Sequence, residues 1–226
     1  MTFPYRTILY DLDGTLIDHF NVIYRCYVHA LETIGLPVPD RATVVRTVGG
    51  SMEVTMRHFV EENHHAAAVE LFRAHFEKIY LEEIHLLPGV PELLHELAAR
   101  GCRQGVFTNK NGPGSRAIIR HLGLDDILQP VVGSLDTPYR KPQEAFTRHI
   151  LREIDGTPET TCLVGDSPFD IEAARVVGMD VYGVATGTHE GAELQAAGAT
   201  AVFANLPAWA AHFGVTVQPA SPSVER

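Results

Sequence analysis

The chain has 226 residues, of which 45% are hydrophobic and 20% charged, and its formal net charge is −10. This composition is ordinary for a globular protein, and the length allows one large domain or one domain with an insert. The negative charge argues against nucleic acid or a membrane surface as partner, because both attract surfaces rich in lysine and arginine. A small anionic substrate in a local basic pocket remains compatible with it.

The sequence carries no membrane or export signal that we can identify. No stretch approaches the ~20 apolar residues of a spanning helix, and Asp11 interrupts the first apolar run, which therefore lacks the core of a signal peptide. Cys26, Cys102 and Cys162 are far apart and form no CxxC pair, so we interpret them as core residues in a reducing compartment. We expect a cytoplasmic protein.

The predicted elements alternate between strands and helices. Short apolar runs that end at polar or glycine-containing turns are typical of strands buried on both faces. The first such strand is at 7–10. After a long insert we expect a helix at 90–100, a strand at 105–107, a helix at 115–122, a strand at 130–132, a helix at 142–152, a strand at 161–164, a helix at 168–177 and a strand at 181–184. This alternation predicts an α/β fold with a doubly wound parallel sheet.

The segment after the first strand has a different character. Its apolar residues recur at helical spacing from Phe20 to about Ile84, with breaks at Pro37 and Gly49–Gly50. We predict an inserted all-α domain at 19–85, a core of residues 1–18 and 86–213, and a flexible tail at 214–226. Aromatic residues recur at helical spacing within the insert, and we interpret them as its core rather than as a binding surface: Tyr24, Tyr27, Phe72, Phe76 and Tyr80.

The strongest chemical signal is DLDGTLID, which directly follows the first strand. Residues two apart on an extended chain point to the same side, so Asp11 and Asp13 leave the strand end as a pair, and Gly14 allows a tight turn. Two adjacent carboxylates repel, so one pKa must rise unless a cation intervenes. That arrangement suits one ionised nucleophile and one protonated acid, although a pair of turn residues is the simpler alternative.

A second acidic motif, VGDSPFD, follows the strand at 161–164. Asp166 and Asp170 are four apart and approach one another if a helix starts near Ser167. Carboxylate oxygens at the ends of two strands suit Mg²⁺. Capping of the helix by Asp166 or Ser167 is an alternative that does not exclude the first.

Two further motifs, FTNK and YRKP, could contact a phosphate. The Thr108 hydroxyl and the amides after it can donate to phosphate oxygens, and Lys141 stands just before a helix that Pro142 can begin. Taken alone, the first also fits an ordinary turn and the second a solvated surface lysine.

The four motifs are more informative together than singly, because most of their candidate residues are predicted to lie at one edge of the sheet. Open α/β sheets bind ligands outside the carboxyl ends of their strands, and four of the residues follow predicted strands: Asp11, Asp13, Thr108 and Asp166. With Asp170, four carboxylates would enter one cleft. If Asp13 holds a proton, three negative charges remain, and Mg²⁺ with Lys141 would cancel them.

In this order the motifs resemble those of the haloacid dehalogenase superfamily of phosphohydrolases. DLDGT matches its first motif, Thr108 its second, Lys141 its third and GDSPFD its fourth, and the helical insert looks like that superfamily's type 1 cap. The likeness runs from about Thr7 to Gly187 and is most similar to the phosphoglycolate phosphatase-like branch.

The resemblance implies a Mg²⁺-dependent phosphatase that hydrolyses a small phosphate monoester through an aspartyl-phosphate. Asp11 would be the nucleophile and Asp13 the acid and base. The transferring group would be contacted by Thr108, Asn109 and Lys141. The cation would be held by Asp11, the Asp13 backbone carbonyl and Asp166, with Asp170 assigned to the metal site chiefly as an orienting group.

Departures from the family pattern bear on the substrate. Dehalogenases of the superfamily lack the acid at the position of Asp13, which therefore favours phosphoryl transfer. His19 stands where many relatives carry Ser or Thr. Four residues flank the Gly49–Gly50 break and could meet the leaving group, of which we assign Arg46 to substrate binding: Arg46, Ser51, Arg57 and His58.

Several alternatives stay open at this stage. A sugar phosphomutase resembling β-phosphoglucomutase, or a pyrophosphatase, would use the same motifs. A receiver-type signalling domain also places acids, Thr and Lys around an Asp, but it is about half this length. We expect a small-molecule phosphate ester as partner, neither nucleic acid nor membrane, and a monomer or weak homodimer.

Overall fold

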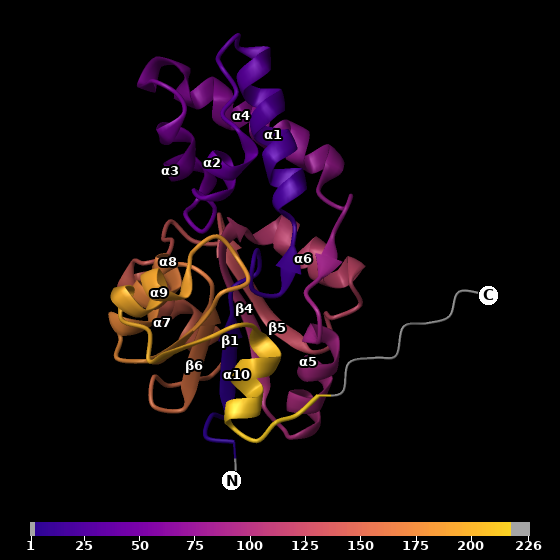
Figure 1. Cartoon of the computed structure of the whole chain (residues 1–226), viewed down its shortest axis with the longest axis vertical. Coiled ribbons are helices and arrows are strands. Elements are labelled where there is room, and N and C mark those ends of the chain that lie inside the picture. Colours follow the sequence, from indigo (N-terminus) through magenta and orange to yellow (C-terminus); the bar gives the residue numbers. More distant parts are fainter. Residues whose placement is uncertain (1–2, 218–226) are drawn as a thin grey trace, which may run out of the picture.

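A computed structural model describes residues 3–217, and its core is a six-stranded sheet. The sheet runs in the order β5-β4-β1-β6-β7-β8, and every neighbouring pair is parallel. The strands are β1 (Thr7–Tyr10), β4 (Arg103–Asn111), β5 (Leu128–Ser134), β6 (Thr161–Gly165), β7 (Asp180–Val184) and β8 (Ala201–Phe203). Helices cover both faces (Figure 1), which confirms the predicted doubly wound α/β fold.

The apolar side chains of β1 divide between the two faces, as the period of two of a strand requires. Ile8 and Tyr10 belong to a core cluster with side chains of α5 (Val90–Ala99), α6 (Gly112–His121) and α10 (Leu206–His212). Leu9 belongs to a second cluster with side chains of α7 (Glu144–Glu153) and α8 (Pro168–Arg175), and α9 (Gly191–Ala197) packs beside α8. This central strand is buried on both faces, and its carboxyl end presents Asp11.

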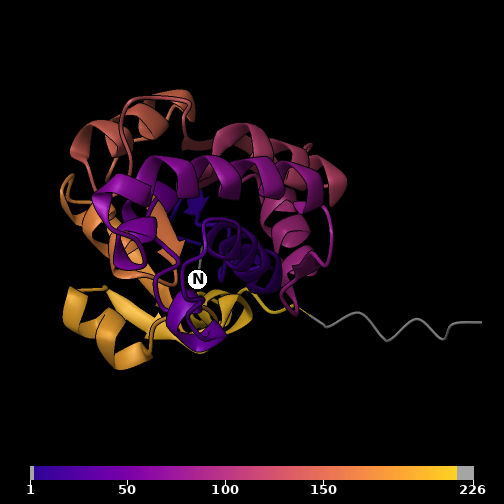
Figure 2. The same cartoon turned by 90° about the horizontal axis from the view of Figure 1, so that it is seen from above.

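The insert is entirely helical apart from its connections, and it lies over the carboxyl ends of the core strands (Figures 1 and 2). It comprises α1 (Phe20–Thr33), α2 (Arg41–Val45), α3 (Met52–Thr55), the 3-10 helix η1 (Met56–His58) and α4 (Glu62–Ile79). The chain enters and leaves it through an antiparallel pair, β2 (Ile17–Asp18) and β3 (His85–Leu86). The expected boundaries of the insert fall within this pair.

Some elements differ from their predicted extents. Strand β4 continues to Asn111 because β5 pairs with it as far as Asn111 opposite Ser134, so Thr108 lies within the strand and not after it. Helix α7 begins at Glu144, since residues 140–143 form a turn closed by Gln143 N–H donating to Arg140 O at 2.8 Å. The short elements β8, α9 and α10 were not predicted.

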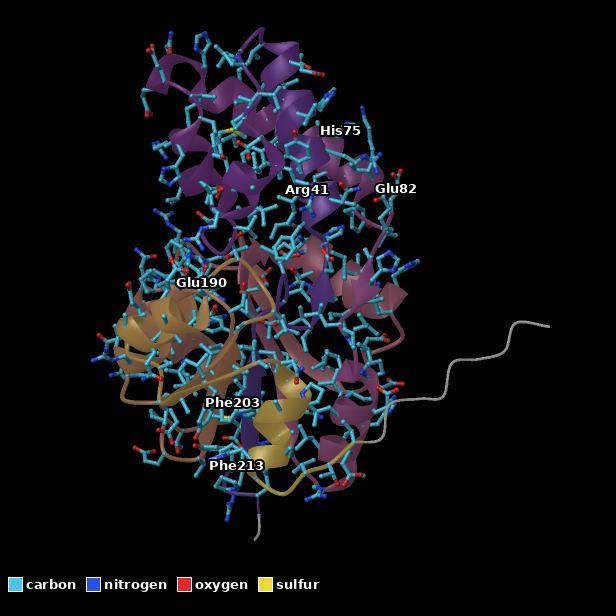
Figure 3. All side chains as sticks on the ribbon, in the orientation of Figure 1. Arg41, His75, Glu82, Glu190, Phe203 and Phe213 are labelled. Atoms are coloured by element: carbon cyan, nitrogen blue, oxygen red, sulfur yellow. The ribbon has the colours of Figure 1, made fainter. Side chains whose placement is uncertain are left out.

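The end of the core remote from the insert is closed by aromatic rings. Phe203 and Phe213 lie there (Figure 3), with ring centroids 6.1 and 5.6 Å from that of Tyr182. Val215 is fully buried in the adjoining cluster, so the prediction of a flexible tail from residue 214 is wrong at its start, and residues 218–226 lie outside the described part of the chain. Within residues 3–217, no helix combines the length and apolar content needed to cross a membrane.

Candidate active site

A buried lysine joins two of the predicted acidic residues. Lys141 Nζ lies 3.1 Å from Asp11 Oδ1 and 2.5 Å from Asp170 Oδ1, and it donates to the Phe107 carbonyl at 2.9 Å. The turn before α7 holds the lysine in place, because its backbone N–H donates to Asn109 Oδ1 at 2.8 Å. Burial alone would lower the pKa of Lys141, but the charges of Asp11 and Asp170 raise it, so the lysine is a fixed cation.

Asp170 is held on both of its carboxylate oxygens. Besides Lys141 on Oδ1, the Ser167 N–H and hydroxyl donate to Oδ2 at 3.1 and 2.6 Å. Ser167 precedes α8, which starts at Pro168 as the acidic motif predicts. Ser167 and Asp170 together cap α8, and Asp170 also binds Lys141. Capping by Ser167, one of the two candidates from the sequence, thus occurs beside the acidic cluster.

Asp166 leaves the carboxyl end of β6 and is held by two threonines. Thr15 Oγ1 donates to its Oδ1, and the Thr188 N–H donates to its Oδ2, each at 3.1 Å. The backbone approaches the carboxylate so closely that a Cβ on Gly187 would lie 1.7 Å from Oδ2, and one on Gly14, whose φ is +80°, would lie 2.6 Å away. Glycine at both positions is thus a requirement of this carboxylate's placement.

Three of the carboxylates form a cluster suited to a divalent cation. Asp11, Asp166 and Asp170 each offer an oxygen, and these oxygens lie within 4.8 Å of one another in a buried site. Burial raises the pKa of Asp11 to about 6 against the opposing charge of Lys141. Burial, and then repulsion from Asp11 and Asp170, raises the pKa of Asp166 well above its usual range. Repelling, desolvated carboxylate oxygens of this kind fit a hard cation such as Mg²⁺.

Asp13 lies apart from this cluster and has its own cation. Lys110 Nζ lies 2.9 and 3.0 Å from its two carboxylate oxygens, and His19 Nδ1 is 3.7 Å from Oδ1. Burial would raise the pKa of Asp13, but Lys110 and then His19 outweigh it and lower the pKa to about 2. The expectation that Asp13 holds a proton is therefore wrong for this arrangement, because Lys110 was not included in the charge count.

The corrected count of charges at the site leaves a net charge that one divalent cation would neutralise. Four carboxylates, those of Asp11, Asp13, Asp166 and Asp170, face the two ammonium groups of Lys110 and Lys141. With all four acids ionised, two negative charges remain, which one divalent cation would neutralise. Buried charges are tolerated only when they are compensated in this way.

Of the remaining predicted site residues, Thr108 and Asn109 lie at the site and Arg46 does not. Thr108 lies beside Asp11, and its side chain helps to lower the pKa of that carboxyl. The Asn109 amide is committed to structure, because Nδ2 donates to the carbonyls of Gly49 and Lys141 at 2.9 and 3.2 Å. Arg46 does not line the pocket over Asp11, and it instead pairs with Glu193 of α9 at 2.7 Å. The structure therefore does not support Arg46 as a substrate-binding residue.

A pocket of about 720 Å³, including its open mouth, lies between the core and the insert above Asp11 and Asp13. Thr108, Asn109 and Lys110 line its core side, and α1, α3 and α4 supply its other wall. Tyr27, Phe72 and Phe76 pack in the core of the insert and also line this pocket, so their interpretation as core residues alone was incomplete. The acidic cluster and an accessible cavity thus meet at Asp11.

A family of known proteins matches most of this chain. The sequence profile of haloacid dehalogenase-like hydrolases matches residues 8–184, which include the four aspartates of the site together with Lys110 and Lys141. The chain belongs to this family. The resemblance inferred from the motifs is thereby confirmed.

Two relatives among known proteins can be compared with this chain directly. A phosphoglycolate phosphatase from Rhodospirillum rubrum is 32% identical over 218 residues, covering 90% of this chain and 90% of that protein. The tyrosine-protein kinase PtkA of Mycobacterium tuberculosis is 30% identical over 182 residues, covering 80% of this chain. The chain spans only 62% of the length of PtkA.

Two solved structures share the fold. A family member from Streptococcus pneumoniae superposes with a TM-score of 0.81 at 23% identity, over 88% of this chain and 93% of that one. A hydrolase from Pseudomonas syringae gives a TM-score of 0.79 at 22% identity, over 92% and 98%.

Three residues that hold the acids were missed from the sequence. Lys110 follows the FTN triplet directly, yet its pairing with Asp13 spans 97 positions. Thr15 lies within the first motif and could have been noted there, whereas Thr188 stands in the loop after β7, for which the sequence suggested no role. All three would have needed a three-dimensional argument.

Proposed function

We propose that this hydrolase is a Mg²⁺-dependent phosphatase that cleaves a small phosphate monoester through an aspartyl-phosphate on Asp11. The observation that carries the proposal is the placement of Asp11, which lies at the floor of the pocket and also within the acidic cluster. A carboxylate in that position can reach a phosphoryl group in the pocket, while the neighbouring acids supply ligands for a cation.

Asp11 would attack phosphorus in line with the leaving oxygen. Lys141, 3.1 Å from Asp11 Oδ1, orients the nucleophile and offers positive charge to the phosphoryl oxygens, and Thr108 offers a hydroxyl on the same side. Mg²⁺, when bound, would draw negative charge from the phosphoryl oxygens, and Asp11, the Asp13 backbone carbonyl and Asp166 would hold it, with Asp170 as an orienting group.

Asp13 would act as general acid toward the leaving group and as general base toward water. Ionised beside Lys110, it is ready to accept a proton from the water that hydrolyses the phosphoenzyme. For the first step it needs a proton, and a phosphate monoester, whose second pKa is about 6, can bring one. That proton would pass to Asp13 and from there to the departing alkoxide, so that the leaving group departs as an alcohol.

The test is phosphate release from a generic phosphoryl donor such as acetyl phosphate, with and without EDTA. We expect Asp11→Asn to lower turnover by at least about a thousandfold at an unchanged melting temperature. Asp126→Asn removes an exposed acid of the core and is the matched control. Turnover by Asp11→Asn close to that of the control would refute Asp11 as nucleophile.

The same assay separates the alternatives raised by the sequence. A phosphomutase would convert a sugar phosphate with little release of phosphate, whereas a pyrophosphatase would show its highest kcat/KM with pyrophosphate. Phosphoglycolate belongs in the panel because relatives carry that activity in their names. Three further predictions accompany this proposal: a cytoplasmic location, a small phosphate ester as partner, and a monomer or weak homodimer.

A further inference from the structure

The wall of the pocket that faces Asp11 is apolar. Five side chains of the insert form it, and we call them the apolar wall: Ile23, Tyr27, Met52, Phe72 and Phe76. Three of them are aromatic rings in mutual contact. The centroid of Phe72 lies 5.0 Å from that of Tyr27, edge to face, and 6.2 Å from that of Phe76, nearly parallel.

The cations that line the pocket, within the described residues, are each paired with an acid. Lys110 bonds both oxygens of Asp13 and lies 4.9 Å from the centre of the Phe76 ring. Arg73 of α4 pairs with Glu53 of α3, and both line the pocket. A second anionic group on a substrate would therefore find no unpaired cation on this wall, and it would have to displace Asp13 or Glu53.

Besides the Arg73–Glu53 pair, two neutral hydroxyl groups on the same side of the pocket are bonded to each other. The hydroxyl groups of Tyr27 and Thr55 lie 2.5 Å apart, so the tyrosine presents its ring to the pocket while its polar end is satisfied. An amphipathic ring used in this way contributes apolar contact area. The wall thus favours a leaving group with little charge.

The insert is closed onto the core in this structure. Asn109 Nδ2 donates to Gly49 O at 2.9 Å, and Thr188 Oγ1 donates to Val48 O at 3.2 Å. The apolar wall is therefore held over the catalytic acids. The pocket, about 720 Å³ with its open mouth included, lies between this wall and Asp11.

We propose that the physiological leaving group is a neutral, apolar alcohol, with an aromatic ring as the best fit, and that phosphate esters of short acids such as glycolate are poor substrates. This inference rests on the proposed phosphatase function and narrows its substrate class. Burying a ring against the apolar wall is favourable, whereas moving a carboxylate to the same place without a partner is costly.

The experiment compares esters of primary alcohols, so that the reactivity of the phosphate group changes little along the series. The panel is 2-phenylethyl phosphate, butyl phosphate, 2-aminoethyl phosphate and phosphoglycolate. We expect kcat/KM to fall in the order phenylethyl, butyl, then the two charged esters, with phenylethyl phosphate at least about tenfold above phosphoglycolate. Phosphoglycolate hydrolysed as well as, or better than, phenylethyl phosphate would overturn the inference and leave the phosphatase proposal intact.

Glu53→Gln provides a gain of function that a merely structural role would not produce. It leaves Arg73 as an unpaired cation on the pocket, and we expect it to raise the ratio of kcat/KM for phosphoglycolate to that for butyl phosphate severalfold. Glu62→Gln, which removes the partner of Arg57 outside the pocket, is the matched control and should change neither value. An unchanged ratio in Glu53→Gln would count against the inference.

Met52→Ser tests the apolar wall itself. Met52 is only partly buried, so its loss endangers folding less than loss of Phe72, and a thermal melt checks this. We expect the ratio of kcat/KM for phenylethyl phosphate to that for acetyl phosphate to fall several-fold. A ratio equal to that of the unmodified enzyme would contradict the assignment of Met52.

Complete inactivity on all the esters and on acetyl phosphate would instead defeat the phosphatase proposal. The inference on the pocket then still has a binding test with non-hydrolysable phosphonates. Calorimetry should show tighter binding of 3-phenylpropylphosphonate than of 3-phosphonopropionate. Equal or reversed affinities would overturn the inference.

Discussion

Lys110 Nζ lies 2.9 and 3.0 Å from the two carboxylate oxygens of Asp13. This buried contact joins β4 to the chain that follows its neighbouring strand β1. The pair lowers the pKa of Asp13 to about 2, below its ordinary value of 3.8. Stability from this pair is therefore present above about pH 4 and is lost as the pH falls toward 2. The proposed base is thus ionised throughout the neutral range.

Lys110→Met should move the acidic limb of the pH–rate profile upward by at least about one pH unit. Without the lysine, burial is no longer opposed by its charge, so the pKa of Asp13 rises and the base is protonated over a wider range. The measurement is kcat from pH 3 to 8. Lys78→Met, at an exposed position of α4, is the control, and coincident profiles for the two variants would exclude this role of Lys110.

Mg²⁺ should raise the melting temperature more at pH 7.5 than at pH 5. The raised pKa values of Asp11, about 6, and of Asp166 mean that the metal-free fold binds protons there, so it loses stability as the pH rises from about 4 toward 6. The cation competes with those protons, and its effect should grow over the same range. Asp166→Asn should abolish the shift. A shift independent of pH would contradict the site.

Lys141→Met should lower the free energy of unfolding by about 3 kcal/mol, because it leaves Asp11 and Asp170 buried without their shared cation. Denaturant unfolding measures this. The control is Arg148→Met, which removes an exposed pair with Glu144 on α7 and should cost about 0.5 kcal/mol or less. Equal costs would show that Lys141 is not a structural counterion.

Gly187→Ala should abolish the stabilisation by Mg²⁺ and most of the turnover. A Cβ at this position would lie 1.7 Å from Asp166 Oδ2, so the carboxylate has to move away from the acidic cluster. Gly191→Ala is a fair comparison, since its Cβ would meet only a side-chain methyl at 3.4 Å. If Mg²⁺ raised the melting temperature of Gly187→Ala as much as that of the unmodified protein, the close packing around Asp166 would not matter for binding of the cation.

Arg46→Ala and Glu193→Ala should have equal, small effects on kcat/KM, no more than about fivefold, and the double variant should resemble either single one. The reason is that Arg46, at the end of α2, pairs with Glu193 of α9 and does not line the pocket. A much larger loss in Arg46→Ala alone would restore the role in substrate binding that the sequence suggested.

Much of this protein follows from the sequence because the deciding patterns are local. The run at Thr7–Tyr10 is apolar on both faces, so it has to be a central strand, and a chain turn directly after it delivers Asp11 and Asp13 to the edge where ligands bind. The same reasoning places Asp166 after β6. Helical spacing without strand signals likewise identifies the insert between β2 and β3.

Only the tertiary structure decided which charges meet and what the pocket is made of. Lys110 lies 97 residues from Asp13 and Arg46 lies 147 from Glu193, and no local pattern ranks such partners. Side chains such as Phe72 carry the spacing of a core residue whether or not a cavity lies beside them. Local sequence sets backbone conformation and which face is buried, whereas charge pairing and cavity lining depend on how the insert packs over the sheet.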